Sequence, residues 1–228
     1  MIYLNKKNIK ASLVFNLIIA VLTIFASIIM FTGFKFMHGP EILLETTKLG
    51  MFKFFTVQSN IFMGIISLLF VVKELKIINK EDIELTILDY ILKLMSTTSV
   101  GLTFFVVFAY LGPISKDGIA SMLMNSNLFF HLIIPVLSII TFIFFEKSDK
   151  ISFKNTFFGI VPTVLYGIYY ISNILLHMES GKVDFKYDWY WFVQNGVCTA
   201  LIVMPIVLII AYLISVTLWR LNKVKVKE

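Results

Sequence analysis

Charge is scarce in this chain of 228 residues. Only 15% of the residues are Asp, Glu, Lys or Arg, whereas 58% are hydrophobic, and the mean hydropathy is +0.89. A water-soluble domain covers its surface with charged and polar side chains, which this composition does not supply. The sequence therefore excludes an ordinary soluble domain and predicts a protein surrounded by lipid.

Cysteine and closely spaced metal ligands are also scarce. The one cysteine, Cys198, cannot form an internal disulfide, and we interpret it as a small buried apolar residue. A metal site could be sought among His38, Glu41, His131 and His177, but no pair of them has the tight spacing of a zinc motif. We therefore expect no metal and no other cofactor.

Long apolar runs are what the sequence does contain. A membrane-spanning helix needs about 20 mostly apolar residues, and we find six such runs separated by short polar breaks. The sequence predicts a single domain over residues 1–228, an all-α integral membrane protein with six transmembrane helices at roughly 11–34, 54–72, 94–112, 127–145, 157–176 and 196–219. The first run is too long for a signal peptide, so we expect it to be retained.

The basic residues predict the orientation of these helices. Of the 20 Lys and Arg residues, 14 fall in one set of breaks: Lys6, Lys7, Lys10, Lys73, Lys76, Lys80, Lys93, Lys147, Lys150, Lys154, Arg220, Lys223, Lys225 and Lys227. The richer set is expected in the cytoplasm, which places both termini there. Richness in Ile, Lys, Asn and Phe suggests a bacterial plasma membrane. The net charge of +6 thus reflects topology and anionic lipid, and no nucleic-acid partner is expected.

Polar residues recur at one depth, the outer end of four expected helices. These are Thr56, Gln58, Ser59, Asn60, Asn125, Asn127, His131, Asn173, His177, Gln194 and Asn195. Polar side chains within a span point into the bundle because lipid cannot satisfy them. Many such residues only join helices, at about 0.6 kcal/mol each, and this reading suits Asn16, Thr23 and Ser27. The shared depth of the outer group instead favours a pocket.

His131 is the most informative of these residues. Pro135 has no amide hydrogen for the carbonyl group of His131, so we expect the helix to be loosened there. Thr56, at matching depth, could serve as a nucleophile with His131 as its base. Asn60 and Asn127 could stabilise an oxyanion. With no acidic residue in the outer halves of the spans, a third member would be an amide, a tyrosine or a backbone carbonyl.

Two short motifs carry a family resemblance. The segment Phe54-Phe55-Thr56-Val57-Gln58-Ser59-Asn60, followed by Asn127-x-x-x-His131-x-x-x-Pro135, resembles the androgen-induced and androgen-dependent family of six-span membrane proteins and their bacterial relatives. Animal members are described as intramembrane threonine hydrolases that cleave fatty acid esters of hydroxy fatty acids. The resemblance implies that Thr56 is the nucleophile, that His131 is its base and that the partner is a membrane lipid or lipid ester. Gln58, Ser59 and Asn60 stand where animal members are more apolar.

Other functions remain open at this stage. A non-catalytic sensor or assembly protein would explain every polar residue as a contact between helices. A small-molecule transporter usually carries a charged residue within the membrane, and beyond Lys93 and Asp89, expected at the interface, we find none in the spans. Hydrolysis of a lipid ester, or acyl transfer from it, is the leading hypothesis. It places Asn60, Gln58, Ser59, Asn127, Asn173 and His177 around the substrate.

The predicted orientation can be tested by single-cysteine labelling in a Cys198→Ser background. A membrane-impermeant maleimide should label Lys150→Cys only after the cells are permeabilised, because that break is expected in the cytoplasm. The matched variant Lys116→Cys, from an outer break, should react in intact cells. Labelling of position 150 in intact cells would reverse the topology.

Overall fold

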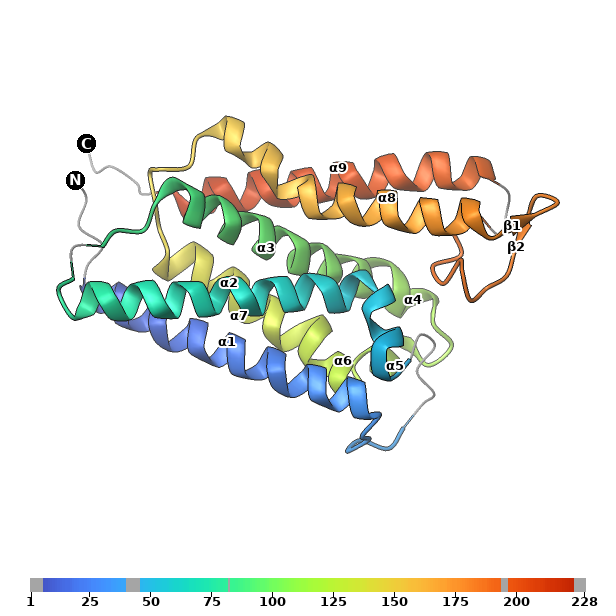
Figure 1. Ribbon diagram of the computed structural model, residues 1–228, viewed down its shortest axis with the longest axis horizontal. Coiled ribbons are helices and arrows are strands. Elements are labelled where there is room, and N and C mark those ends of the chain that lie inside the picture. Colours follow the sequence, from blue (N-terminus) through green and yellow to red (C-terminus); the bar gives the residue numbers. More distant parts are fainter. Residues whose placement is uncertain (1–5, 40–45, 82, 194–196, 224–228) are drawn as a thin grey trace.

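The computed structural model describes residues 6–39, 46–81, 83–193 and 197–223. They form a bundle of long helices that run side by side (Figure 1). The long helices include α1 (Lys6–Thr32), α2 (Phe55–Ile78), α8 (Val161–Leu176) and α9 (Val197–Asn222). α1 begins and α9 ends at the same end of the bundle. This end is called the terminal end below, and the opposite one the loop end.

The apolar helices confirm an all-α, multi-pass membrane protein. In the described part of the chain, five helices are long and apolar enough to cross a membrane: Lys7–Thr32, Ile87–Ile114, Ser126–Phe145, Phe153–Leu176 and Thr199–Asn222. α2 was expected as a further span but is not among these five. It has 24 residues, carries polar side chains near both ends and packs along α1. The sixth span therefore stays a prediction.

The central helix is interrupted near the loop end. α3 (Ile87–Val106) contacts α2, α7, α8 and α9. It begins with a capping box in which Thr86 and Asp89 satisfy each other's backbone N–H groups. It continues through a π-helical turn, η2 (Val107–Leu111), into the short α4 (Gly112–Ile114), and α5 (Gly118–Met122) follows.

The fourth expected span has the distortion that Pro135 predicted. It consists of α6 (Ser126–Leu128), the π-turn η3 (Phe129–Ile133), α7 (Ile134–Ile140) and a second π-turn, η4 (Thr141–Phe145). The N–H of Ile134 bonds the carbonyl of Phe129, five residues earlier, in place of the usual four. The loosening at His131 is therefore confirmed, and such π-turns are frequent at functional sites.

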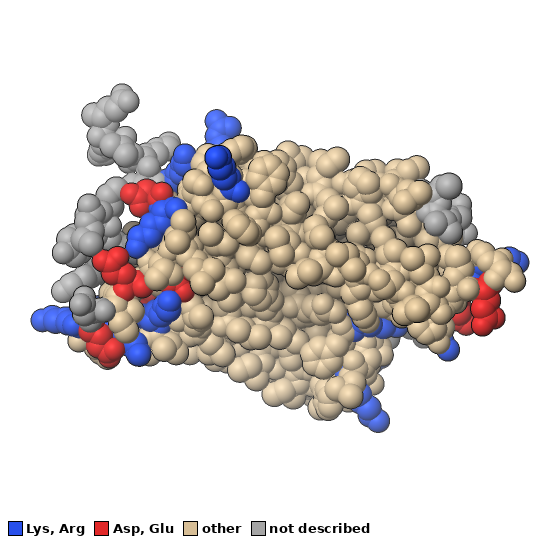
Figure 2. Space-filling view, turned by 45° about the horizontal axis from the view of Figure 1, so that its top comes forward, with Lys and Arg blue, Asp and Glu red and all other residues tan. Residues whose placement is uncertain are grey.

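The remaining elements are short and connect the long helices. The 3-10 turns η1 (Lys48–Lys53) and η5 (Phe153–Ile160) lead into α2 and α8. A small hairpin of β1 (Met178–Glu179) and β2 (Lys182–Val183), paired antiparallel, lies between α8 and α9. Charged residues gather toward the two ends of the molecule, and the broad middle of the face in Figure 2 is uncharged. An uncharged middle with exposed apolar side chains suits a lipid environment.

Gly159 sets the close approach of η5 to α9. A Cβ added at Gly159 would lie 2.2 Å from the Ser215 hydroxyl oxygen. That hydroxyl donates to the Thr156 carbonyl (2.8 Å), so it is fixed in place. We expect Gly159→Ala to lower the free energy of unfolding by about 1–3 kcal/mol through overpacking.

The double variant Gly159→Ala/Ser215→Gly should recover part of that loss, because it removes the atoms that collide. Thermal unfolding in detergent measures both variants. A wild-type melting temperature for Gly159→Ala would contradict the packing described here.

Candidate functional site at the loop end

His131 is buried and held by one hydrogen bond. Its Nδ1 lies 2.6 Å from the Met122 carbonyl oxygen, at the end of α5. A carbonyl oxygen only accepts, so Nδ1 carries the hydrogen and Nε2 is left with its lone pair. The orienting group is thus a backbone carbonyl, and this tautomer is the one a general base needs.

Thr56 lies in the first turn of α2, half-buried, and its hydroxyl has no hydrogen-bond partner among the described residues. Its carbonyl oxygen accepts from Asn60 Nδ2 (2.8 Å) and from Ser59 Oγ (3.0 Å). Asn60 Nδ2 also donates to the Phe130 carbonyl (3.1 Å), beside His131. Asn60 therefore joins the turn of Thr56 to the turn of His131, although no hydrogen bond links those two side chains directly.

The expected oxyanion donor is already engaged. Both hydrogens of the Asn60 amide point at carbonyl groups, whereas its Oδ1 is buried without a partner. Ser59 Oγ lies 3.2 Å from Thr103 Oγ1, and Gln58 is exposed and donates to the Phe52 carbonyl (2.7 Å). Asn127 is buried at the start of α6. These contacts assign Gln58 and Ser59 to the local packing of α2.

Asn173 and His177 contact the loop that follows α8. Asn173 Nδ2 donates to the Tyr187 carbonyl (2.8 Å), and the exposed His177 stacks on the Tyr187 ring at 3.6 Å. Both residues hold this loop. A pocket that also includes these two side chains stays a prediction. Gln194 and Asn195, expected in the same layer, lie outside the described residues.

That loop forms a folded cap over the start of α2. The fully buried Asp188 accepts from the Tyr170 hydroxyl and from the backbone N–H groups of Phe192 (2.9 Å) and Val193 (3.1 Å). Trp189 Nε1 donates to the Tyr166 hydroxyl (3.0 Å). These contacts fix the loop, and none of the ion pairs found in the described ranges includes Asp188.

Tyr190, in this cap, is a residue that the sequence analysis missed. Its hydroxyl oxygen accepts from the Phe55 N–H (3.1 Å) and interacts with the backbone of Thr56. Burial raises the pKa of Tyr190 to about 12, so the hydroxyl keeps its proton at neutral pH. The aromatic run Trp189-Tyr190-Trp191 was the available signal, but nothing in it indicated contact with α2.

An apolar groove of about 400 Å³ lies between α1 and α2. Its lining includes Ala20, Ile24, Met51, Ile61 and Gly64. Thr56 and His131 are not part of this lining, although Met51 and Ile61 lie near Thr56 in the chain. The lining of this groove is almost entirely apolar.

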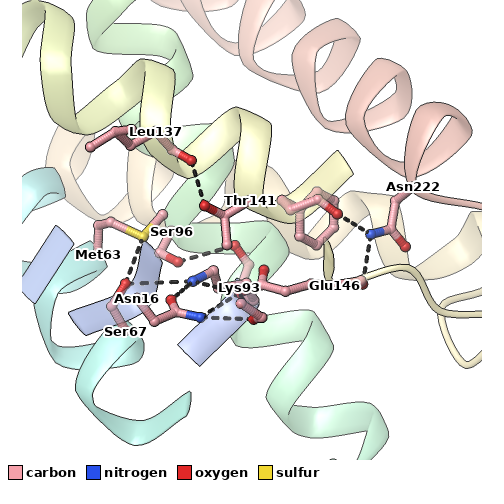
Figure 3. A network of polar contacts seen from close by, with 11 residues as sticks. Asn16, Met63, Ser67, Lys93, Ser96, Leu137, Thr141, Glu146 and Asn222 are labelled. Carbon is pink, nitrogen blue, oxygen red and sulfur yellow. Dashed lines mark hydrogen bonds and ion pairs between the residues drawn. The ribbon is translucent and has the colours of Figure 1, made fainter. Parts of the chain in front are cut away.

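A second polar cluster lies toward the terminal end, and the sequence analysis missed it too. Lys93 is fully buried, and its Nζ lies 3.1 Å from Glu146 Oε1, itself 1% exposed (Figure 3). Lys93 was expected at the membrane interface, and the structure shows that its side chain is buried inside the bundle. The argument against a transporter, which needed the spans to lack buried charge, no longer holds. Asn16, interpreted as a simple helix contact, bonds both members of this ion pair.

Because this ion pair is buried, we expect a single variant to lose much more free energy of unfolding than the double variant. Lys93→Met should lower the free energy of unfolding by about 3–5 kcal/mol, because it leaves Glu146 buried without its cation. Lys93→Met/Glu146→Gln should recover most of that loss. The exposed pair of Lys150 and Glu84, 3.3 Å apart, supplies the control.

Lys150→Met should cost less than about 1 kcal/mol, because solvent screens an exposed pair. Unfolding in detergent, followed by circular dichroism, measures all three variants. Equal losses for Lys93→Met and Lys150→Met would show that burial does not govern the pair.

Two polar layers thus stand at different depths in one bundle. One holds a buried histidine whose Nδ1 is hydrogen-bonded to a backbone carbonyl, and the other holds a buried lysine and glutamates. Their chemistry has to be argued from geometry alone, since no family model, curated protein or solved structure matches this chain.

Proposed function

We propose that this membrane protein hydrolyses an ester of a fatty acid, with Thr56 as nucleophile and His131 as general base. The observation that carries the proposal is the hydrogen bond from His131 Nδ1 to the Met122 carbonyl. This hydrogen bond fixes the tautomer in which Nε2 keeps its lone pair. His131 is buried on the π-turn η3, and Asn60 links this turn to the turn of Thr56. The family resemblance assigns the same two roles.

The chemistry follows from these two side chains. His131 Nε2 takes the hydroxyl proton of Thr56 as Oγ1 attacks the ester carbonyl carbon, and a tetrahedral oxyanion forms. The imidazolium returns the proton to the departing alcohol oxygen as the C–O bond breaks. Water then attacks the acyl carbon as His131 takes its proton, and the imidazolium returns that proton to Thr56 Oγ1 as the acyl–oxygen bond breaks and the fatty acid leaves. An alcohol in place of water would give acyl transfer instead.

Closure of the dyad is part of this proposal. The Thr56 hydroxyl has no competing hydrogen bond in the described residues, so it is free to turn toward Nε2. The π-turn η3 lacks the regular bonding that would hold His131 rigid. Binding of the substrate would supply the free energy to bring the two side chains within about 3 Å of each other.

The surroundings suit an apolar acyl chain and a developing negative charge. The groove between α1 and α2 offers hydrocarbon walls near the start of α2. The protonated hydroxyl of Tyr190 lies beside the backbone of Thr56, and it is a better placed oxyanion donor than the engaged Asn60 amide. The substrate is therefore proposed as a lipid ester that enters from the bilayer at the loop end. With the topology predicted above, this is the outer face of a bacterial plasma membrane.

The test is turnover of a fluorogenic fatty acid ester by the purified protein in lipid nanodiscs. Thr56→Ala and His131→Ala should each lose on the order of 10³-fold in rate, and the double variant should lose no more, because the base has nothing to activate without its nucleophile. Thr56→Ser should keep measurable turnover. Tyr190→Phe should lose about 10²-fold if its hydroxyl stabilises the oxyanion.

The control is Thr32→Ala, whose hydroxyl is exposed and bonds the Ile28 carbonyl of its own helix (2.8 Å). It should keep the wild-type rate, and a fluorophosphonate probe should label wild type and Thr32→Ala but not Thr56→Ala. Equal turnover in wild type and Thr56→Ala would exclude this hydrolase. The outer layer would then be explained by a binding or assembly role, or by transport.

A further inference from the structure

The cluster toward the terminal end contains an unequal number of buried charges. Lys93 Nζ contacts Glu146 Oε1 (3.1 Å), donates to Asn16 Oδ1 and to Ser67 Oγ (3.5 Å), and lies 4.8 Å from the centre of the Phe70 ring. It is the only positive charge that these contacts bring into the cluster. Figure 3 shows its ammonium group pointing between Asn16 and Glu146.

Glu146 is held on one oxygen only. Its Oε1 accepts from Asn16 Nδ2 (2.7 Å) and from Ser12 Oγ (3.3 Å), besides the contact with Lys93. Its Oε2 is buried and has no hydrogen-bond partner. A buried carboxylate oxygen without a donor is costly, so this atom marks a place for a missing hydrogen or cation.

Glu74, from α2, is the second carboxyl group of the cluster. It is 2% exposed, and its Oε2 is also buried without a partner. It lies close enough to Lys93 and Glu146 for direct electrostatic interaction, and it neighbours Ser12. Among the ion pairs of the described residues, none includes Glu74.

The neighbouring ionisable groups do not balance this charge. Lys73, the adjacent residue on α2, has its Nζ 2.7 Å from both carboxylate oxygens of Asp89. From α3, Tyr90 adds a phenol near both glutamates, and α1 contributes the uncharged Ser12 and Asn16. Two carboxyl groups therefore share one ammonium.

We infer that Glu74 and Glu146 together hold one exchangeable proton, so that the cluster around Lys93 is a proton-binding site. An uncompensated carboxylate in an apolar interior costs several kcal/mol, whereas a protonated one is neutral and can donate a hydrogen bond. With one proton bound, the cluster contains one carboxylate, one ammonium and one carboxylic acid. Loss of the proton leaves both carboxylates to share Lys93.

This arrangement gives Lys93 two alternative partners. Its ammonium neutralises Glu146 in the structure, and Glu74 is the carboxyl group left for the proton. If either glutamate is removed, the other becomes the sole partner of Lys93 and has no reason to bind a proton. If Lys93 is removed, both glutamates have to be protonated. The site thus couples one proton to the position of one lysine, at the end of the bundle away from Thr56.

Infrared difference spectroscopy of the full chain in nanodiscs tests the inference. Wild type at neutral pH should show the C=O stretch of a protonated carboxylic acid, which shifts in D₂O. Glu74→Gln and Glu146→Gln should each lose this band, although each keeps one of the two carboxyl groups. Lys93→Met should show about twice the wild-type intensity, because two neutral acids replace one.

The matched control is Glu84→Gln, which makes the same chemical change at a glutamate that is 62% exposed. It should keep the wild-type band, and size-exclusion elution should establish that every variant is folded. Absence of the band in wild type, or its persistence in both Glu74→Gln and Glu146→Gln, would overturn the inference. A band that appears only when choline replaces Na⁺ and K⁺ would also overturn it, because an alkali cation would then occupy the site.

The readout is independent of ester turnover. The hydrolase proposal can fail while the carboxylic acid band is present, and the band can be absent while esters are cleaved. The two results therefore separate the chemistry of the loop end from that of the terminal end.

Discussion

The ion pair of Lys93 and Glu146 is the interaction on which the terminal half of the bundle depends. A lysine with no exposed surface needs partners on every side, and these come from α1, α2 and the residue that ends η4. The chain segments that supply them are distant in sequence, with 130 residues between Asn16 and Glu146. Because lipid offers no replacement for any of these contacts, the helices that carry them have only one register in which the charge is satisfied.

The need to satisfy polar groups inside the bundle, where lipid cannot, also explains the irregular helices. Backbone groups freed by Pro135 and by the π-turns have to find partners inside the bundle, and side chains from neighbouring helices provide them. Asn60 bonds the Phe130 carbonyl, and Asn222 from α9 bonds the carbonyls of Phe142 and Glu146. The turns η3 and η4 are therefore each tied to an amide on another helix. These hydrogen bonds stabilise the distorted turns at which the side chains of His131 and Glu146 project.

Structural features that depend on a single segment could be predicted from the sequence. Features that depend on contacts between several segments could not. Apolar runs predicted the five helices that are long enough to cross a membrane, and Pro135 predicted the loosened turn at His131. Lys93 and Glu146 border apolar runs, where charges usually reach water, so their burial was not visible without the partner helices. The cap built on Asp188, Tyr170 and Trp189 depends on contacts between α8, its loop and the start of α2, which no periodicity indicates.

α2 connects the two polar layers, with Thr56 in its first turn and Glu74 in its last turns. Between them Gly64 packs directly on Thr23 of α1, where an added Cβ would lie 2.8 Å from the threonine methyl carbon. This close contact fixes the position of α2 relative to α1 at the middle of the bundle. A proton exchanged at Glu74 changes the charge at one end of α2, whereas the hydrolysis proposed for Thr56 returns its proton within each cycle. The ester chemistry therefore does not consume the proton of the terminal end, and what the two layers share is α2, whose middle is held against α1 by this contact.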